Sequence, residues 1–144
     1  MKKVCGFLAV SVISMLAVAC CNQNNKEMKY SSEPFKVGSE IQIDTVKPGL
    51  SRQVLCYNDD IMLVKVFFGE EMVGQRPPLH THPHSQSSYI ISGKFEMHCG
   101  DEVKILGPGD AYYAAPNVPH EAYCLEAGVV IDGFSPMRET FIEK

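Results

Sequence analysis

From about Phe35 onward, the chain alternates short β-favouring runs with clusters of turn-forming residues, and this rhythm restricts its fold more than any other feature. The runs are rich in Val, Ile, Phe and Tyr, a composition typical of strands. No segment before the last few residues shows the periodicity of a helix. Many short strands at this spacing predict an all-β fold, either a closed or a double-sheet antiparallel barrel.

At 144 residues the chain has room for one sizeable domain and hardly for two, and residues 35–144 are predicted to form it. Turns are predicted, among other places, at Asn58-Asp59-Asp60, at Gly93 and at Glu126-Ala127-Gly128. The predicted strands are Ile41–Val46, Gln53–Tyr57, Ile61–Phe68, Leu79–His82, Ser88–Ser92, Lys94–Cys99, Glu102–Leu106, Ala111–Ala115, Glu121–Leu125 and Val129–Phe134.

The first residues have the pattern of an export signal, with two early lysines and an apolar run from Val4 to Ala19. This pattern resembles a bacterial lipoprotein signal, in which residues 1–19 are removed and Cys20 carries the lipid on its sulfur. Cys21 as the modified residue and an ordinary secretory signal are the alternatives. Residues 20–34 are polar and predicted to be a flexible tether. The expected location is the bacterial cell envelope, periplasm-facing or at the outer membrane, with the lipid as the only membrane contact.

The net charge and the spacing of the cysteines argue against several classes of function. The formal charge of −4 without a basic block argues against nucleic-acid binding. Cys56, Cys99 and Cys124 lack the spacing of a zinc ribbon or a redox motif. Export permits disulfides, but we favour the interpretation that these three cysteines are small buried residues on strands.

The segment from Gly74 to Gly93 carries the clearest chemical pattern. His80 and His82 are separated by one residue, so their imidazoles face the same side of an extended chain. Gln86 follows with an amide oxygen. Because paired imidazoles suit divalent transition metals, the segment predicts a metal site.

These spacings resemble the first motif of the cupins, small β-barrels in which a glycine, His-x-His, a glutamate and a second glycine follow at fixed intervals. Gly74, His80, His82 and Gly93 match this motif, and Gln86 stands where the glutamate would be.

In the second cupin motif, Gly109 and His120 match, whereas Ala115, Asn117 and Cys124 replace the usual residues. The resemblance implies a single cupin double-stranded β-helix, a jelly-roll barrel, and it is compatible with a homodimer. It also implies one divalent transition metal, such as Ni, Zn, Mn or Fe, held by His80, His82, Gln86 and His120.

Gln86 in place of a carboxylate would leave the metal its full positive charge and make it a stronger Lewis acid. The ligand set also departs from the two-histidine, one-carboxylate set of iron oxygenases, which favours polarisation of a hydroxyl, a carbonyl or water. The alternative is that Gln86 is not a ligand. His84 shares the parity of the histidine pair, but Pro83 can turn it away, so a position beside the site or on the surface is favoured.

Asp132, Phe134 and Arg138 place an acid, an aromatic ring and an arginine near the end of the chain, a set that suits a small carboxylated sugar. Together with Gln86 they resemble the pectin degradation cupins of the KdgF type over about residues 54–141. That family opens the ring of 4,5-unsaturated monouronates from pectin or alginate, giving linear 4-deoxy-5-keto-uronates.

The resemblance implies a lyase- or isomerase-type enzyme of carbohydrate metabolism, with catalytic roles for Asp132 and Arg138 and substrate binding by Phe134 and Arg138. Purely structural roles are the alternative: a turn cap for Asp132, a core position for Phe134 and a surface ion pair for Arg138. The competing functions are another metal-dependent cupin enzyme, a dioxygenase or a small-acid lyase, and a lipid-anchored cupin that binds a small acidic ligand without turnover.

Overall fold

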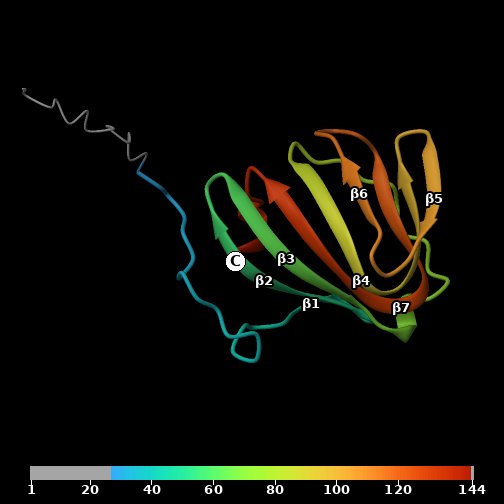
Figure 1. Cartoon of the computed structure of the whole chain (residues 1–144), viewed down its shortest axis with the longest axis horizontal. Helices are drawn as coiled ribbons and strands as arrows, with labels where there is room; N and C mark the ends of the chain where they lie inside the picture. Colours follow the sequence, from blue (N-terminus) through green and yellow to red (C-terminus); the bar gives the residue numbers. More distant parts are fainter. Residues whose placement is uncertain (1–26, 144) are drawn as a thin grey trace, which may run out of the picture.

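The computed structural model describes residues 27–143; the predicted signal and Cys20 lie outside them. Seven strands, all paired antiparallel, form one curled sheet in the order β1-β2-β3-β7-β4-β5, with β6 also paired to β4 (Figure 1). The elements are β1 (Asp44–Lys47), β2 (Leu50–Asn58), β3 (Ile61–Phe68), η1 (Glu70–Met72), β4 (Ser85–Cys99), β5 (Glu102–Leu106), β6 (Ala111–Ala114), β7 (His120–Ser135) and η2 (Glu139–Phe141). The all-β prediction is confirmed, and none of the described helices has the length and apolar character needed to cross a membrane.

The β2–β3 hairpin turns where the sequence predicts, because the side-chain oxygen of Asn58 accepts hydrogen bonds from the backbone N–H groups of Asp60 and Ile61. The first predicted strands are displaced, since β1 begins at Asp44 and β2 already at Leu50. Gly49, at a φ of 73°, makes the turn between them.

Two predicted turns are wrong, because Gly93 lies within β4 and residues 126–128 lie within β7. These two strands pair along almost their whole length, with register shifts on either side of Ser92. Such bulges bend a strand without ending it. The glycines allow the close approach at the bend: a Cβ on Gly128 would lie 2.1 Å from the carbonyl oxygen of Ser92.

The predicted strand Leu79–His82 is also wrong, since only a single bridge, between His80 and His120, forms there. The cysteine prediction holds in part: all three are free, but only Cys124 is buried, Cys99 is partly buried and Cys56 is exposed. Cys56 follows a register shift in β2, and this irregularity moves it out of the inward-facing series.

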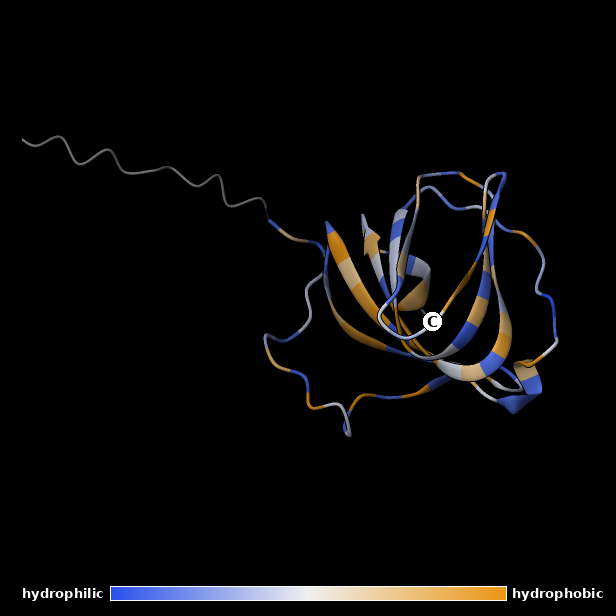
Figure 2. Ribbon diagram, turned by 45° about the vertical axis from the view of Figure 1, so that its right-hand side comes forward, coloured by the Kyte–Doolittle hydropathy of each residue, from blue (hydrophilic) through white to orange (hydrophobic). Residues whose placement is uncertain are grey.

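Hydrophobic and hydrophilic residues alternate along the strands (Figure 2), and the buried apolar side chains make up the core. They form two clusters. One contains Met72, Ile90, Phe95, Met97, Cys124 and Val130, and the other contains Met62, Val64, Phe134 and Met137.

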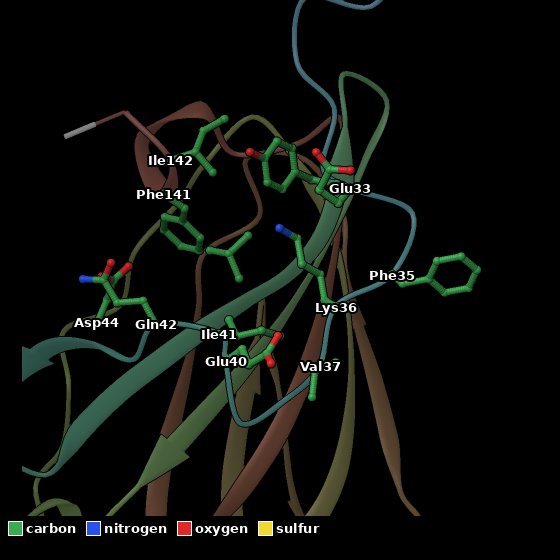
Figure 3. Close-up of a pocket in the computed structure, with 12 residues that line it drawn as sticks. Glu33, Phe35, Lys36, Val37, Glu40, Ile41, Gln42, Asp44, Phe141 and Ile142 are labelled. Atoms are coloured by element: carbon green, nitrogen blue, oxygen red, sulfur yellow. The ribbon is translucent and has the colours of Figure 1, made fainter.

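The segment before β1 lies along the outside of β2. Asp59 accepts hydrogen bonds from the backbone N–H groups of Lys29 and Tyr30, and the Gln53 amide donates to the carbonyls of Gly38 and Ile41. A cavity of about 600 Å³ lies between this segment and the C-terminal residues Phe141 and Ile142 (Figure 3). Its lining contains none of the predicted metal ligands.

Candidate metal centre

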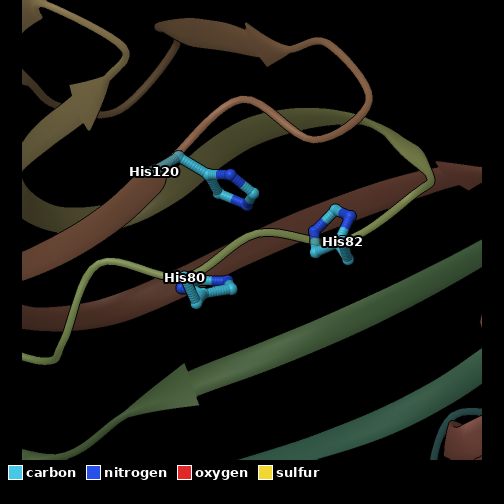
Figure 4. A group of neighbouring side chains, drawn as sticks. All are labelled: His80, His82 and His120. Atoms are coloured by element: carbon cyan, nitrogen blue, oxygen red, sulfur yellow. The ribbon is translucent and has the colours of Figure 1, made fainter.

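His80, His82 and His120 come together inside the curled sheet (Figure 4). One potential ligand nitrogen from each ring lies within 4.8 Å of the others. The ring centroids of His80 and His120 are 4.4 Å apart and those of His82 and His120 are 4.7 Å apart. His82 and His120 are buried, whereas His80 is the exposed member. The structure therefore unites the three histidines that the two motifs identify.

Backbone hydrogen bonds fix this arrangement. His80 and His120 exchange N–H to carbonyl bonds of 3.1 and 3.0 Å, which aligns the extended segment with the start of β7. The carbonyl of His82 accepts a 2.8 Å bond from the N–H of Asn117. Asn117 has a φ of 62°, a conformation that asparagine adopts more readily than most residues. The second-motif loop thus pins the first-motif histidines in place.

Two of the imidazoles have a defined tautomer. His82 Nδ1 lies 3.1 Å from the carbonyl oxygen of His84, and His120 Nδ1 lies 2.8 Å from that of Val118. A carbonyl can only accept, so each Nδ1 carries the proton and each Nε2 keeps a lone pair when the ring is neutral. Burial, followed by other positive groups nearby, lowers the pKa of His80; burial also lowers that of His82. Both rings are therefore neutral at neutral pH, as metal ligation requires.

The orientation of the Gln86 amide is also determined. Ser88 donates its hydroxyl proton to the carboxylate of Asp132, so Ser88 Oγ can only accept from Gln86. The Gln86 NH₂ group accordingly donates to Ser88 at 3.2 Å and to the Tyr112 hydroxyl at 2.9 Å. The amide oxygen then faces His82 Nε2 at 3.0 Å.

These donor atoms fit a divalent cation. The lone pairs of His82 Nε2 and Gln86 Oε1 face each other, and His120 Nε2 is buried without a hydrogen-bond partner. Facing lone pairs repel one another unless a cation lies between them, and imidazole nitrogens with an amide oxygen are ordinary ligands of transition metals. His84 does not belong to the three-histidine group, although its ring centroid is 5.4 Å from that of His82.

Asp132 lies on β7, close to Gln86 and Ser88. In the sheet register it pairs with Ser88 on one side and with Val64 on the other. Burial raises the pKa of its carboxyl to about 6, against the opposing effects of the hydrogen bond from Ser88, of the nearby Gln86 amide and of the Arg138 charge. A carboxyl in this environment can both accept and release a proton near neutral pH. It lies in mid-strand, so it does not cap a turn.

Phe134 serves the core and faces the candidate site at once. It is buried against Met62, Val64 and Met137, and its ring meets that of His82 edge to face at a centroid distance of 5.7 Å. The core position predicted as its structural alternative is correct, and it does not separate the ring from the histidines.

Arg138 reaches back from the tail over the same interior. Its guanidinium carbon lies 5.3 Å from the ring centroid of Phe134 and 4.3 Å from that of Phe141. Its Nε is buried without a hydrogen-bond partner, and burial lowers the pKa of the guanidinium. This packing differs from a surface ion pair, because the partly buried guanidinium stacks on aromatic rings.

Ser88 and Tyr112 orient Gln86, and neither is among the site residues predicted from the sequence. Ser88 could have been found, since it lies two residues after Gln86 on one strand and so shares its face. Tyr112 could not, because its place opposite Ser88 depends on the β4–β6 register.

Comparison with known proteins agrees with this architecture. The cupin domain family matches residues 68–132. The chain is 36% identical over 110 residues to the pectin degradation protein KdgF of Dickeya dadantii (strain 3937), covering 75% of this chain and 97% of the relative.

Two solved structures are similar as well. An RmlC-like cupin from Shewanella frigidimarina NCIMB 400 superposes with a TM-score of 0.72 at 39% identity, covering 77% of this chain and 97% of the other. KdgF from Halomonas sp. superposes with a TM-score of 0.68 at 35% identity, covering 74% and 98%. The chain belongs to the cupins and, among them, to the KdgF-type pectin degradation proteins.

Proposed function

We propose that this protein opens the ring of 4,5-unsaturated monouronates, from pectin or alginate breakdown, to linear 4-deoxy-5-keto-uronates. The observation that carries the proposal is the meeting of a three-histidine group with a partly buried acid and a partly buried arginine in a relative of KdgF. His80, His82, Gln86 and His120 would hold one divalent transition metal. When bound, the metal would supply a Lewis acid that polarises substrate oxygens.

The reaction is an isomerisation, so its atoms balance within the substrate. The anomeric hydroxyl loses its proton, the bond between the anomeric carbon and the ring oxygen breaks, and an aldehyde and a C5 enolate form. The enolate becomes a ketone when C4 gains a proton. Asp132 would accept a proton from the anomeric hydroxyl and return one to C4, a task that its pKa of about 6 suits.

Arg138 would bind the substrate carboxylate through two parallel hydrogen bonds, and the ring of Phe134 would pack against the sugar. Arg138 and Phe134 are already in contact. The carboxylate and the reacting ring would therefore be held by neighbouring groups, which orients the anomeric hydroxyl towards the histidine group.

The test follows the ultraviolet absorbance of unsaturated monouronates, freshly made by lyases from pectin and from alginate, with metal-loaded protein that lacks residues 1–21. Ring opening destroys the double bond conjugated to the carboxylate, so the absorbance falls. We expect a fall well above the spontaneous rate that Arg138→Ala abolishes and Lys104→Ala, at an exposed position on β5, leaves unchanged.

No change with fully metallated protein would reject the proposal. Oxygen consumption by an iron-loaded sample would then favour a dioxygenase, and tight uronate binding without turnover would favour a binding protein.

We further propose that the protein is attached to the bacterial cell envelope by a lipid on Cys20. The proposal rests on the apolar run that ends at this cysteine. Labelled palmitate should enter the wild-type protein in cells, and Cys20→Ala should lose the label and move to the soluble fraction. Unchanged labelling of this variant would contradict modification at Cys20.

A further inference from the structure

Four side chains within residues 27–143 bury a nitrogen atom that has no hydrogen-bond partner: Arg52 Nε, His84 Nδ1, His120 Nε2 and Arg138 Nε. Buried polar groups are normally paired, so such atoms point to a ligand. The metal would account for His120. Arg52 needs a separate explanation, because it comes from β2, a strand that supplies none of the predicted site residues.

Arg52 faces the interior of the curled sheet. It pairs in register with Val66 of β3, whose side chain packs against the core cluster around Phe134. Its guanidinium carbon lies 3.8 Å from the ring centroid of Phe141, and that of Arg138 lies 4.3 Å from the same centroid. The two guanidinium carbons are therefore no farther apart than the sum of these distances.

This arrangement brings like charges together in a partly buried place. Burial lowers the pKa of both arginines, and the charge of Arg52 lowers that of Arg138 further. Each arginine has a different acidic neighbour: Asp44, opposite Arg52 on β1, raises the pKa of Arg52, and Asp132 raises that of Arg138. A bound metal would add further positive charge. Such a site gains stability from an anion that both guanidinium groups can reach.

We propose that Arg52 is a second carboxylate-binding residue, which together with Arg138 clamps the carboxylate of the uronate across the edge of Phe141. The inference rests on the proposed function for the identity of the ligand. Two arginines would make recognition depend strongly on the carboxylate, so a neutral or esterified sugar would bind poorly. Arg52 would thus determine specificity, whereas Asp132 and the metal would serve the chemistry.

The experiment measures binding of galacturonate and of galactose to metal-loaded protein by calorimetry, with Arg52→Met, Arg52→Lys and the control Lys65→Met. Galacturonate lacks the 4,5 double bond, so its binding is measured without turnover. Lys65 is adjacent on β3, pairs with Gln53 and stacks on Phe67, so the control removes the same charge from the neighbouring strand.

We expect Arg52→Met to weaken galacturonate binding about ten- to a hundredfold, the range for hydrogen bonds to a charged group, with galactose binding and metal content unchanged. Arg52→Lys keeps the positive charge but loses the paired N–H donors of the guanidinium, so its affinity for galacturonate should lie between those of the wild type and Arg52→Met. It also serves as the test if Arg52→Met does not fold.

Unchanged galacturonate affinity in the folded Arg52 variants, or a wild-type protein that does not prefer galacturonate to galactose, would overturn the inference. Arg52-dependent galacturonate binding without any turnover of unsaturated uronates would uphold this site and reject the proposed reaction. Turnover of unsaturated uronates with a KM that Arg52→Met leaves unchanged would uphold the proposed reaction and reject the role of Arg52.

Discussion

At the scale of single residues, Gln86 is the position where the ligand chemistry is set. A glutamate there would keep an oxygen ligand but add a negative charge beside His82. We expect Gln86→Glu to retain the metal and to lower kcat by at least about tenfold, a loss of ~1.4 kcal/mol of transition-state stabilisation, because the metal becomes a weaker Lewis acid. Metal analysis and the absorbance assay check this together. Undiminished turnover at full metal occupancy would refute the charge argument.

Tyr112 should act on the metal through Gln86 rather than by contact. Its hydroxyl accepts the shorter of the two amide hydrogen bonds, so Tyr112→Phe frees the amide to turn its oxygen away. Groups that orient a ligand are typically worth ten- to a hundredfold in metal affinity, and we expect a loss of about tenfold in competition with a chromophoric chelator. Tyr113→Phe is the matched control, since Tyr113 is the exposed neighbour on β6. Equal affinities of the two variants would count against the orienting role.

Which site residues could be predicted from the sequence depends on whether strand pairing is needed to bring them to the site. The histidines and Gln86 could be predicted because they lie close together along the chain, and His120 because its motif has a fixed frame. Arg52 and Tyr112 could not, since each comes from a strand that reaches the site only through pairing with its neighbours. Asp132, Phe134 and Arg138 were predicted from the sequence as a set, and the structure places Phe134 and Arg138 close to His82 and Asp132 close to Gln86.

At the scale of elements, the pairing of β4 with β7 determines whether the site can form, because β4 carries Gln86 and β7 carries His120 and Asp132. We expect Gly128→Ala to destabilise the fold by about 1–3 kcal/mol, the usual cost of overpacking, since its Cβ would lie 2.5 Å from the Cα of Gly93 as well as against Ser92. Thermal unfolding should show a lower Tm. Gly107→Ala is the control, because a Cβ there meets nothing within 4 Å.

The close pairing of β4 and β7 also explains why the turns predicted at Gly93 and at residues 126–128 are wrong. Glycine in a β-rich sequence marks either a turn or a close approach of two backbones, and local sequence does not distinguish them. At Asn58 the side chain itself closes the hairpin, so that turn could be read directly. At Gly93 and Gly128 the reason for glycine is a partner strand about thirty-five residues away along the chain.

At the scale of the whole molecule, the metal should couple the site to global stability. Its predicted ligands come from the segment before β4, from β4 and from the start of β7, so binding requires these parts to be folded together. A ligand that binds only the folded state, present at a hundred times its Kd, raises the free energy of unfolding by about 2.7 kcal/mol. This corresponds to a rise in Tm of roughly 10 °C for a domain of this size.

We expect this rise for the wild-type protein on addition of its metal, and little or none for His120→Ala. His120 is almost fully buried, and its Nε2 has no hydrogen-bond partner. His120→Ala therefore removes one predicted metal ligand and leaves the contacts of residues remote from the site unchanged. An equal rise in both proteins would place the stabilising metal elsewhere and would remove the physical basis for the ligand set.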